Sequence, residues 1–125
     1  MRKLIGLFLV AASASVASAE DGSLSGSKLR EAIAGRTVYV QSPLGEFPIR
    51  YAPNGTMSAR TELALVSGES KSADQGRWWI ADNRLCVQWR TWLEGKPSCY
   101  TMQRSGRSMV RWQSDDGKSG TARLG

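Results

Sequence analysis

Residues 76–100 read GRWWIADNRLCVQWRTWLEGKPSCY, and this stretch decides the fold. It contains both cysteines of the chain and four of its five tryptophans. β-Favouring and aromatic residues flank two turn signals, Asp82-Asn83 and residues 94–97. We therefore predict a β-meander with strands over residues 77–81, 84–91 and 99–104. The tryptophans are expected mainly to supply buried area between the strands.

The two cysteines, Cys86 and Cys99, have only one possible pairing. In an exported protein such a pair typically forms a disulfide. A zinc site is the alternative, but the chain has no histidine, and two thiolates alone do not complete a usual zinc shell. We expect a Cys86–Cys99 disulfide, no metal and no cofactor.

The first residues have the pattern of a secretory signal peptide. Arg2 and Lys3 precede an apolar run over residues 4–12, and small residues follow as far as Ala19. The apolar run is too short for a membrane-spanning helix, which needs about 20 apolar residues. We predict a signal peptide at residues 1–19, cleaved after Ala19, no transmembrane segment and a location in the periplasm. Of the 17 Lys and Arg residues 15 then remain against 11 Asp and Glu, a net charge of +4.

The rest of the chain predicts one small β-rich domain. Residues 20–26 are rich in Gly and Ser and are expected to be a flexible tail, and residues 27–125 form the domain. A short amphipathic helix is predicted over residues 28–34, because Leu29 and Ile33 share one face and Gly35 follows. Alternating patterns predict further strands over residues 37–40, 47–51, 56–60, 109–113 and 120–124, with a mobile loop over 68–75. Residues 62–66 fit either a strand or a short helical turn, and we expect a strand. The fold class is mainly β, an antiparallel meander curled into a barrel or a strongly bent sheet, because such a sheet must hide its edges.

The residue types present argue against catalysis. Without histidine, Ser-His-Asp and Cys-His schemes and most zinc hydrolase sites are excluded. A pair of carboxylates remains formally possible. However, the carboxylates of Asp82, Glu94, Asp115 and Asp116 fall in turn sequences, where solvated side chains are the ordinary outcome. We do not expect an enzyme.

Arginine and aromatic residues are interleaved along the predicted strands. Alternation places Arg90 and Trp92 on one face, and Arg104 on the same face as Tyr100. Arg111 lies in the next strand, beside Trp112. Such side chains bind anionic or ring-bearing ligands through ion pairs and cation–π contacts. The candidate binding residues are Arg90, Trp92, Tyr100, Arg104 and Arg111; the alternative is an ordinary sheet exterior, in which arginine stems cover exposed aromatics.

Export changes which anionic partner the protein is expected to meet. Single-stranded nucleic acid would be considered for a cytosolic protein with this surface. An exported protein instead meets the anionic polymers and lipid head groups of the cell envelope. We expect a non-enzymatic binding or accessory protein that engages such a component and no nucleic acid. The alternative function is a secreted inhibitor of a hydrolase such as a lysozyme; the oligomeric state is not indicated.

Four short segments together resemble a known family. They are residues 51–56 (YAPNGT), 76–80 (GRWWI), 85–89 (LCVQW) and 98–100 (SCY). Their arrangement is similar to that in a family of small exported alphaproteobacterial proteins with a signal peptide, a short helix and a tryptophan-rich β C-terminal half that has two cysteines. The family has no assigned function, so the resemblance implies a location and a fold and supplies no catalytic residues.

Overall fold

A computed structural model of the chain describes residues 22–125. The predicted signal peptide, and residues 20 and 21 of the predicted tail, lie outside the described residues. Between Gly22 and Gly125, no helix combines the length and the apolar character needed to cross a membrane.

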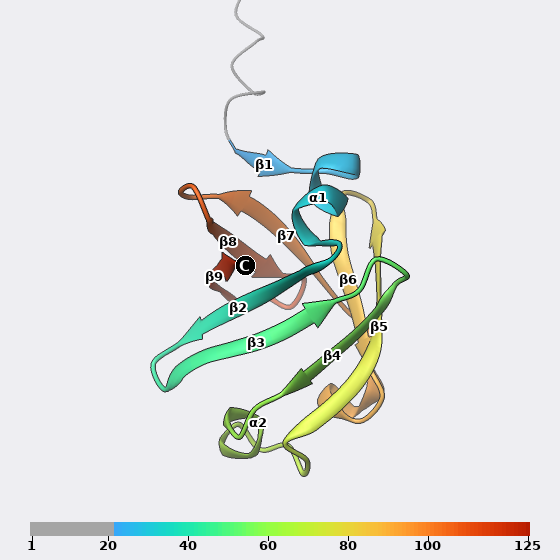
Figure 1. Cartoon of the computed structure of the whole chain (residues 1–125), viewed down its shortest axis with the longest axis vertical. Helices are drawn as coiled ribbons and strands as arrows, with labels where there is room; N and C mark the ends of the chain where they lie inside the picture. Colours follow the sequence, from blue (N-terminus) through green and yellow to red (C-terminus); the bar gives the residue numbers. More distant parts are fainter. Residues whose placement is uncertain (1–21) are drawn as a thin grey trace, which may run out of the picture.

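The central feature is a closed antiparallel barrel (Figure 1). Each strand pairs with the next along the chain, and β9 returns to pair with β2, so the ring has no open edge. The barrel strands are β2 (Arg36–Ser42), β3 (Gly45–Tyr51), β4 (Thr56–Arg60), β5 (Ala73–Ala81), β6 (Arg84–Trp89), β7 (Ser98–Arg104), β8 (Met109–Ser114) and β9 (Ser119–Leu124). The predicted mainly β fold, curled into a barrel, is confirmed.

The stretch quoted first forms β5, β6 and β7, as its turn signals predicted. Asp82 and Asn83 connect β5 to β6 with positive φ values of 53° and 60°, which is typical of the tight turns that join twisted strands. The register pairs Trp78 with Val87 across the two strands, and both side chains are buried. Period-two alternation therefore directs one set of side chains from each strand into the barrel.

A short helix closes one end of the barrel. The helix α1 (Gly26–Ile33) buries Leu29 and Ile33 completely, while the guanidinium of Arg30 lies 4.9 Å from the centroid of the Trp78 ring. A helix of this length is marginal in water, so its stability comes from this docking. The preceding β1 (Ser23–Leu24) pairs with the end of β7. The predicted tail over residues 20–26 thus differs from the structure from Gly22 onward, because β7 extends past β6 and offers its free backbone groups to β1.

The other end of the barrel has two short helical turns. The predicted strand over residues 62–66 is wrong: this segment forms α2 (Leu63–Val66), and β5 already begins within the predicted loop over 68–75. The physical reason is the hydroxyl of Thr61, which accepts a hydrogen bond from the N–H of Leu63 and turns the chain as β4 ends. A 3₁₀ turn at Trp92–Gly95 follows β6 on the same side of the barrel.

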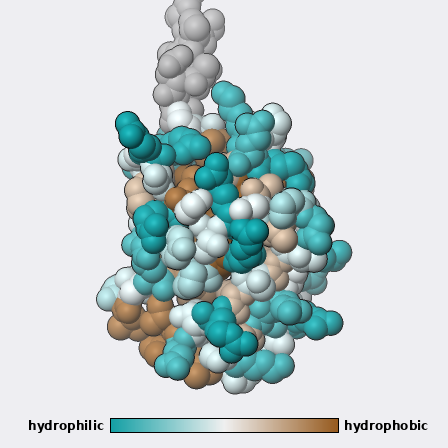
Figure 2. Space-filling model, viewed as in Figure 1, coloured by the Kyte–Doolittle hydropathy of each residue, from teal (hydrophilic) through white to brown (hydrophobic). Residues whose placement is uncertain are grey.

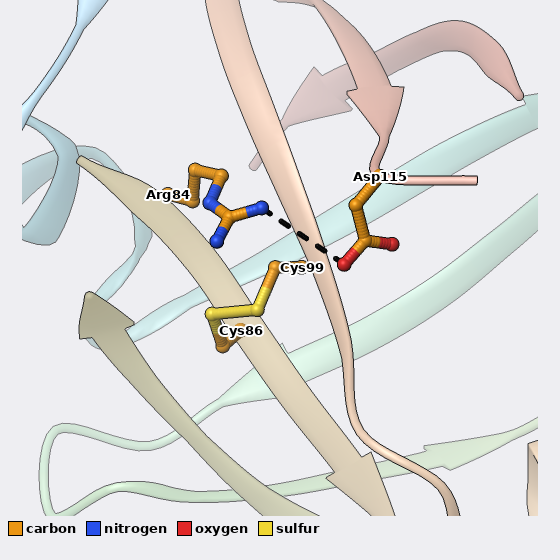
Figure 3. Close-up of a disulfide and its surroundings, with 4 residues drawn as sticks. All are labelled: Arg84, Cys86, Cys99 and Asp115. Atoms are coloured by element: carbon orange, nitrogen blue, oxygen red, sulfur yellow. Dashed lines mark ion pairs between the residues drawn. A yellow bond between two sulfur atoms is a disulfide. The ribbon is translucent and has the colours of Figure 1, made fainter. Parts of the chain in front are cut away.

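The disulfide joins two neighbouring strands. Cys86 on β6 lies directly opposite Cys99 on β7, and the two sulfurs are bonded, which confirms the predicted pairing. Figure 3 shows the bond beside the Arg84–Asp115 ion pair, which spans β7. The disulfide therefore links β6, the last strand of the β2–β6 meander, to β7, the first of the three final strands.

Candidate functional site

A row of polar and cationic side chains crosses the outer face of four strands. The register places Arg50 of β3 opposite Ser58 of β4, and Ser58 opposite Gln75 of β5. The N–H of Arg90, directly after β6, donates to the carbonyl of Gln75 at 2.9 Å. Since strands lie about 4.8 Å apart, Arg50 and Arg90 are separated by about 14 Å at the backbone. Their long side chains can therefore reach one elongated ligand from its two sides.

Further cations surround this row. Arg77 of β5 lies in the next row, where its guanidinium donates two hydrogen bonds to the side-chain oxygen of Gln88 and lies 5.4 Å from the centroid of the Trp79 ring. Arg60 ends β4, and Lys71 precedes β5. We call this surface the basic wall; its five cations are Arg50, Arg60, Lys71, Arg77 and Arg90, and all five are exposed.

The basic wall has almost no negative charge of its own. Within residues 22–125, none of its five cations forms an ion pair with a carboxylate. The one carboxylate among the residues that line its hollows belongs to Asp74, which accepts hydrogen bonds from the N–H groups of Thr91 and Trp92 at 2.8 and 2.9 Å. Burial raises the pKa of Asp74, but the backbone N–H groups of Trp92, Thr91 and Gln75, together with the nearby charge of Lys71, outweigh it and hold that pKa below its usual range. Asp74 is therefore charged and already engaged by the backbone.

Two adjoining hollows shape the basic wall. One, of about 710 Å³, is lined by Arg50, Arg77 and Arg90 among others. The second, of about 690 Å³, shares Arg50 and Arg90 and adds Arg60 and Lys71. Together they form a long shallow depression across β3–β6. Such a depression suits an extended polymer or a surface better than a single enclosed small molecule.

Cations on another part of the barrel are neutralised by carboxylates. Arg123 of β9 contacts Glu46 at 2.8 Å and lies 4.1 Å from the centroid of the Tyr39 ring. The hydrogen bond from Arg123, together with one from Gln41, lowers the pKa of Glu46 to about 2. We call the outer face of β2, β3 and β9 around this pair the ion-paired wall; the pairs Arg84–Asp115 and Lys118–Asp116 lie elsewhere on the barrel.

The structure separates the five predicted binding residues. Arg90 lies on the basic wall. Trp92 is buried, because the strand ends at Trp89 and the 3₁₀ turn directs the indole inward, where it hydrogen-bonds to the Lys71 carbonyl. Tyr100 also faces the interior, where burial raises the pKa of its phenol.

The remaining two predicted residues lie elsewhere on the surface. Arg104 is exposed at the end of β7, where it donates to the carbonyl of Arg107, and Arg111 is exposed on β8. A hollow of about 300 Å³ beside Arg111 has only this one cation in its lining. The predicted group of five is thus not one site: only Arg90 belongs to the main concentration of positive charge.

Four cations of the basic wall were missed from the sequence. A usable signal existed for Arg50, which alternates with the apolar Ile49 and Tyr51 and is therefore expected to face outward. Arg77 similarly precedes the buried Trp78. Alternation shows that each residue faces outward, but only the register between strands shows that they converge.

Comparison of the chain with protein-family models, with curated proteins and with solved structures gave no match. The function is therefore inferred from the residues and their geometry.

Proposed function

We propose that this is a non-enzymatic periplasmic protein that binds an anionic component of the cell envelope through the basic wall. The observation that supports the proposal is the convergence of Arg50, Arg77 and Arg90 around one depression without a carboxylate partner. Guanidinium groups donate paired hydrogen bonds to phosphate and carboxylate oxygens, and such charge-assisted bonds are stronger than neutral ones. The Cys86–Cys99 disulfide fits a protein that works in an oxidising compartment outside the cytoplasm.

The chemistry of the ligand follows from the donors on the surface. Between the arginines lie the side chains of Ser58, Gln75 and Gln88, which add neutral hydrogen-bond donors. Arg77 also covers the Trp79 ring, so the surface combines charge with an aromatic plane. We expect the ligand to present repeated phosphate or carboxylate groups over a distance of about 14 Å or more. Both an anionic polymer and a layer of anionic lipid head groups meet that description.

The test compares two double variants that remove the same charge. R50Q/R90Q removes the ends of the row on the basic wall, and R104Q/R111Q removes two exposed arginines outside it. Soluble polyphosphate and vesicles containing phosphatidylglycerol serve as probes, which separates a polymer from a membrane surface. Binding is measured at about 20 mM and about 300 mM salt, because screening weakens contacts between exposed charges.

We expect R50Q/R90Q to weaken binding of at least one probe about tenfold or more, which corresponds to about 1.4 kcal/mol. R104Q/R111Q is expected to keep most of the wild-type affinity. Equal losses in the two double variants would show that net charge, and not this site, attracts the ligand. Binding that does not weaken at high salt would also contradict the proposal.

A further inference from the structure

An apolar cavity lies inside the barrel, away from the basic wall. Its volume is about 230 Å³, and its lining extends from Tyr51, near the α1 end of the barrel, to Leu93 in the 3₁₀ turn at the other end. Aliphatic and aromatic side chains supply almost all of the lining, among them Val40, Trp89, Trp92, Leu93, Trp112 and Ala122. Small, well-packed barrels usually fill this space with side chains, so a void of this size is a distinct feature.

The aromatic rings hold the cavity open. Trp92 meets Phe47 edge to face at 5.6 Å between centroids and lies 4.7 Å from the centroid of Trp89. Trp112 meets Tyr100 in the same edge-to-face manner at 5.7 Å. Phe47 and Trp92 come from segments that do not pair with each other, whereas Tyr100 and Trp112 lie on the paired strands β7 and β8. The indole N–H of Trp92 also donates a hydrogen bond to the Lys71 carbonyl. This bond fixes the orientation of the ring, so the ring does not fill the cavity.

Charge at the mouth of the cavity selects against anions. The one charged residue in the lining is Glu69, whose carboxylate accepts a hydrogen bond from the N–H of Leu93 at 3.2 Å. An anionic ligand would face this carboxylate and would also lose its own hydration in an apolar space. The cavity therefore favours a neutral molecule, in contrast to the basic wall.

The surface around this end of the barrel is apolar as well. Its exposed large apolar side chains come from the β2–β3 turn, from α2 and from the 3₁₀ turn: Leu44, Leu65, Val66 and Leu93. Figure 2 shows the resulting apolar area at the lower left, where Figure 1 places α2 and the β2–β3 turn. Leu93 belongs both to this surface and to the cavity lining. The apolar surface is thus continuous with the interior at Leu93.

We propose that the cavity binds a small neutral apolar molecule, aliphatic or aromatic, that is somewhat larger than benzene. The size follows from volume, because a dry protein cavity of about 150 Å³ holds benzene. The ligand enters past Leu93 and contacts the faces of Trp89, Trp92 and Trp112. This site differs from the basic wall in charge and in ligand class, although Trp89 lines both the cavity and one hollow of the basic wall.

Toluene and its anionic analogue benzoate are the probes for this site. Titration with toluene is expected to shift the indole N–H resonances of Trp89, Trp92 and Trp112 in a ¹H–¹⁵N spectrum and to raise Tm, because a ligand that binds only the folded state stabilises it. The shifts should persist at high salt. Benzoate at the same concentration is expected to leave these resonances in place.

Two variants keep the test independent of folding. A122F adds a ring inside the cavity and is expected to abolish the toluene shifts; V40F fills part of the same space nearer the β2–β3 turn and covers the case in which A122F does not fold. W79F changes a ring on the outer face of β5 and is the control that should bind toluene normally.

Three results would overturn the proposal. One is toluene binding that survives both A122F and V40F, and another is an equal response to benzoate. The third is concentration-dependent self-association that removes the toluene response and that L44S abolishes. That result would show that a second copy of the chain covers the apolar end. Loss of polyanion binding in R50Q/R90Q leaves all of these measurements unaffected, so failure of one site is distinguishable from failure of the other.

Discussion

The two walls of this barrel are both built from antiparallel strands, but they differ in whether their arginines are paired with carboxylates. On the ion-paired wall, Arg123 is held by Glu46 and stacks on Tyr39, so its charge contributes to the fold. On the basic wall, Arg50 and Arg90 have no carboxylate partner among residues 22–125 and face solvent. Unpaired like charges gain little for the folded state. We propose that their concentration on the basic wall serves ligand binding.

The largest effect is expected where the disulfide joins the two halves of the barrel. Replacing both Cys86 and Cys99 with serine opens the loop that the disulfide closes between two residues 13 positions apart. The free energy of unfolding should fall by about 3 kcal/mol, because the unfolded chain regains the closure entropy of that loop. Urea denaturation at neutral pH measures the change. An unchanged midpoint would mean that the strand pairing of β6 and β7 alone holds the halves together.

Gly76 and Gly120 give the next comparison, because a side chain at either position would meet the neighbouring strand. A methyl group at Gly76 on β5 would collide with the backbone carbonyl of Gln88, which cannot move without breaking the sheet. At Gly120 on β9 it would meet the edge of the Trp112 indole at 2.7 Å, and that ring borders the cavity. We expect G76A to cost about 1–3 kcal/mol and G120A clearly less. Thermal unfolding of the two variants measures the order, and a reversed order would show that Trp112 cannot yield.

Low pH should weaken the ion pair between Glu46 and Arg123. The pKa of Glu46 falls from its ordinary 4.5 to about 2 in the folded protein, so the unfolded state binds more protons between these two pH values. The stabilisation by Glu46 is therefore complete above pH 4.5 and is lost as the pH falls toward 2. The stability difference between wild type and E46Q should shrink between pH 6 and pH 3. A difference that stays constant over this range would contradict the pairing.

Single charge changes should give the smallest effects, with opposite signs on the two walls. R90Q removes one of several unpaired cations and is expected to raise stability slightly at low salt, whereas R123Q removes a paired cation and should lower it slightly. Both changes should fade as salt is added. Paired measurements of Tm at low and high salt test the signs. A loss of stability in R90Q would mean that Arg90 has a structural role.

Much of the fold was readable from the sequence because its strongest signals are local. Asp82-Asn83 indicated the tight turn between β5 and β6, and two cysteines in a chain without histidine allowed one disulfide. The segment 62–66 was predicted wrongly because its apolar run of four residues, 63–66, fits a strand as well as a helical turn. The deciding contact there is the Thr61 side chain, which the periodicity of the run does not reflect.

The candidate site was harder to predict from the sequence, for a different physical reason. Alternation was extended from β6 through Trp92, but the strand ends at Trp89, so Trp92 turns into the barrel and does not accompany Arg90. The convergence of Arg50 with Arg90 depends on the register of four strands, and no local pattern records that register. The cavity depends in turn on how rings from distant strands brace one another, which composition alone does not reveal.

The short pairing of β1 with β7 determines how the molecule is best attached to a support. Gly22 leaves the barrel beside α1, at the end remote from α2 (Figure 1). A linker or label joined ahead of Gly22 would therefore anchor the protein by its plugged end. Every copy immobilised in that orientation would present the apolar end of the barrel to solvent and would leave the basic wall exposed.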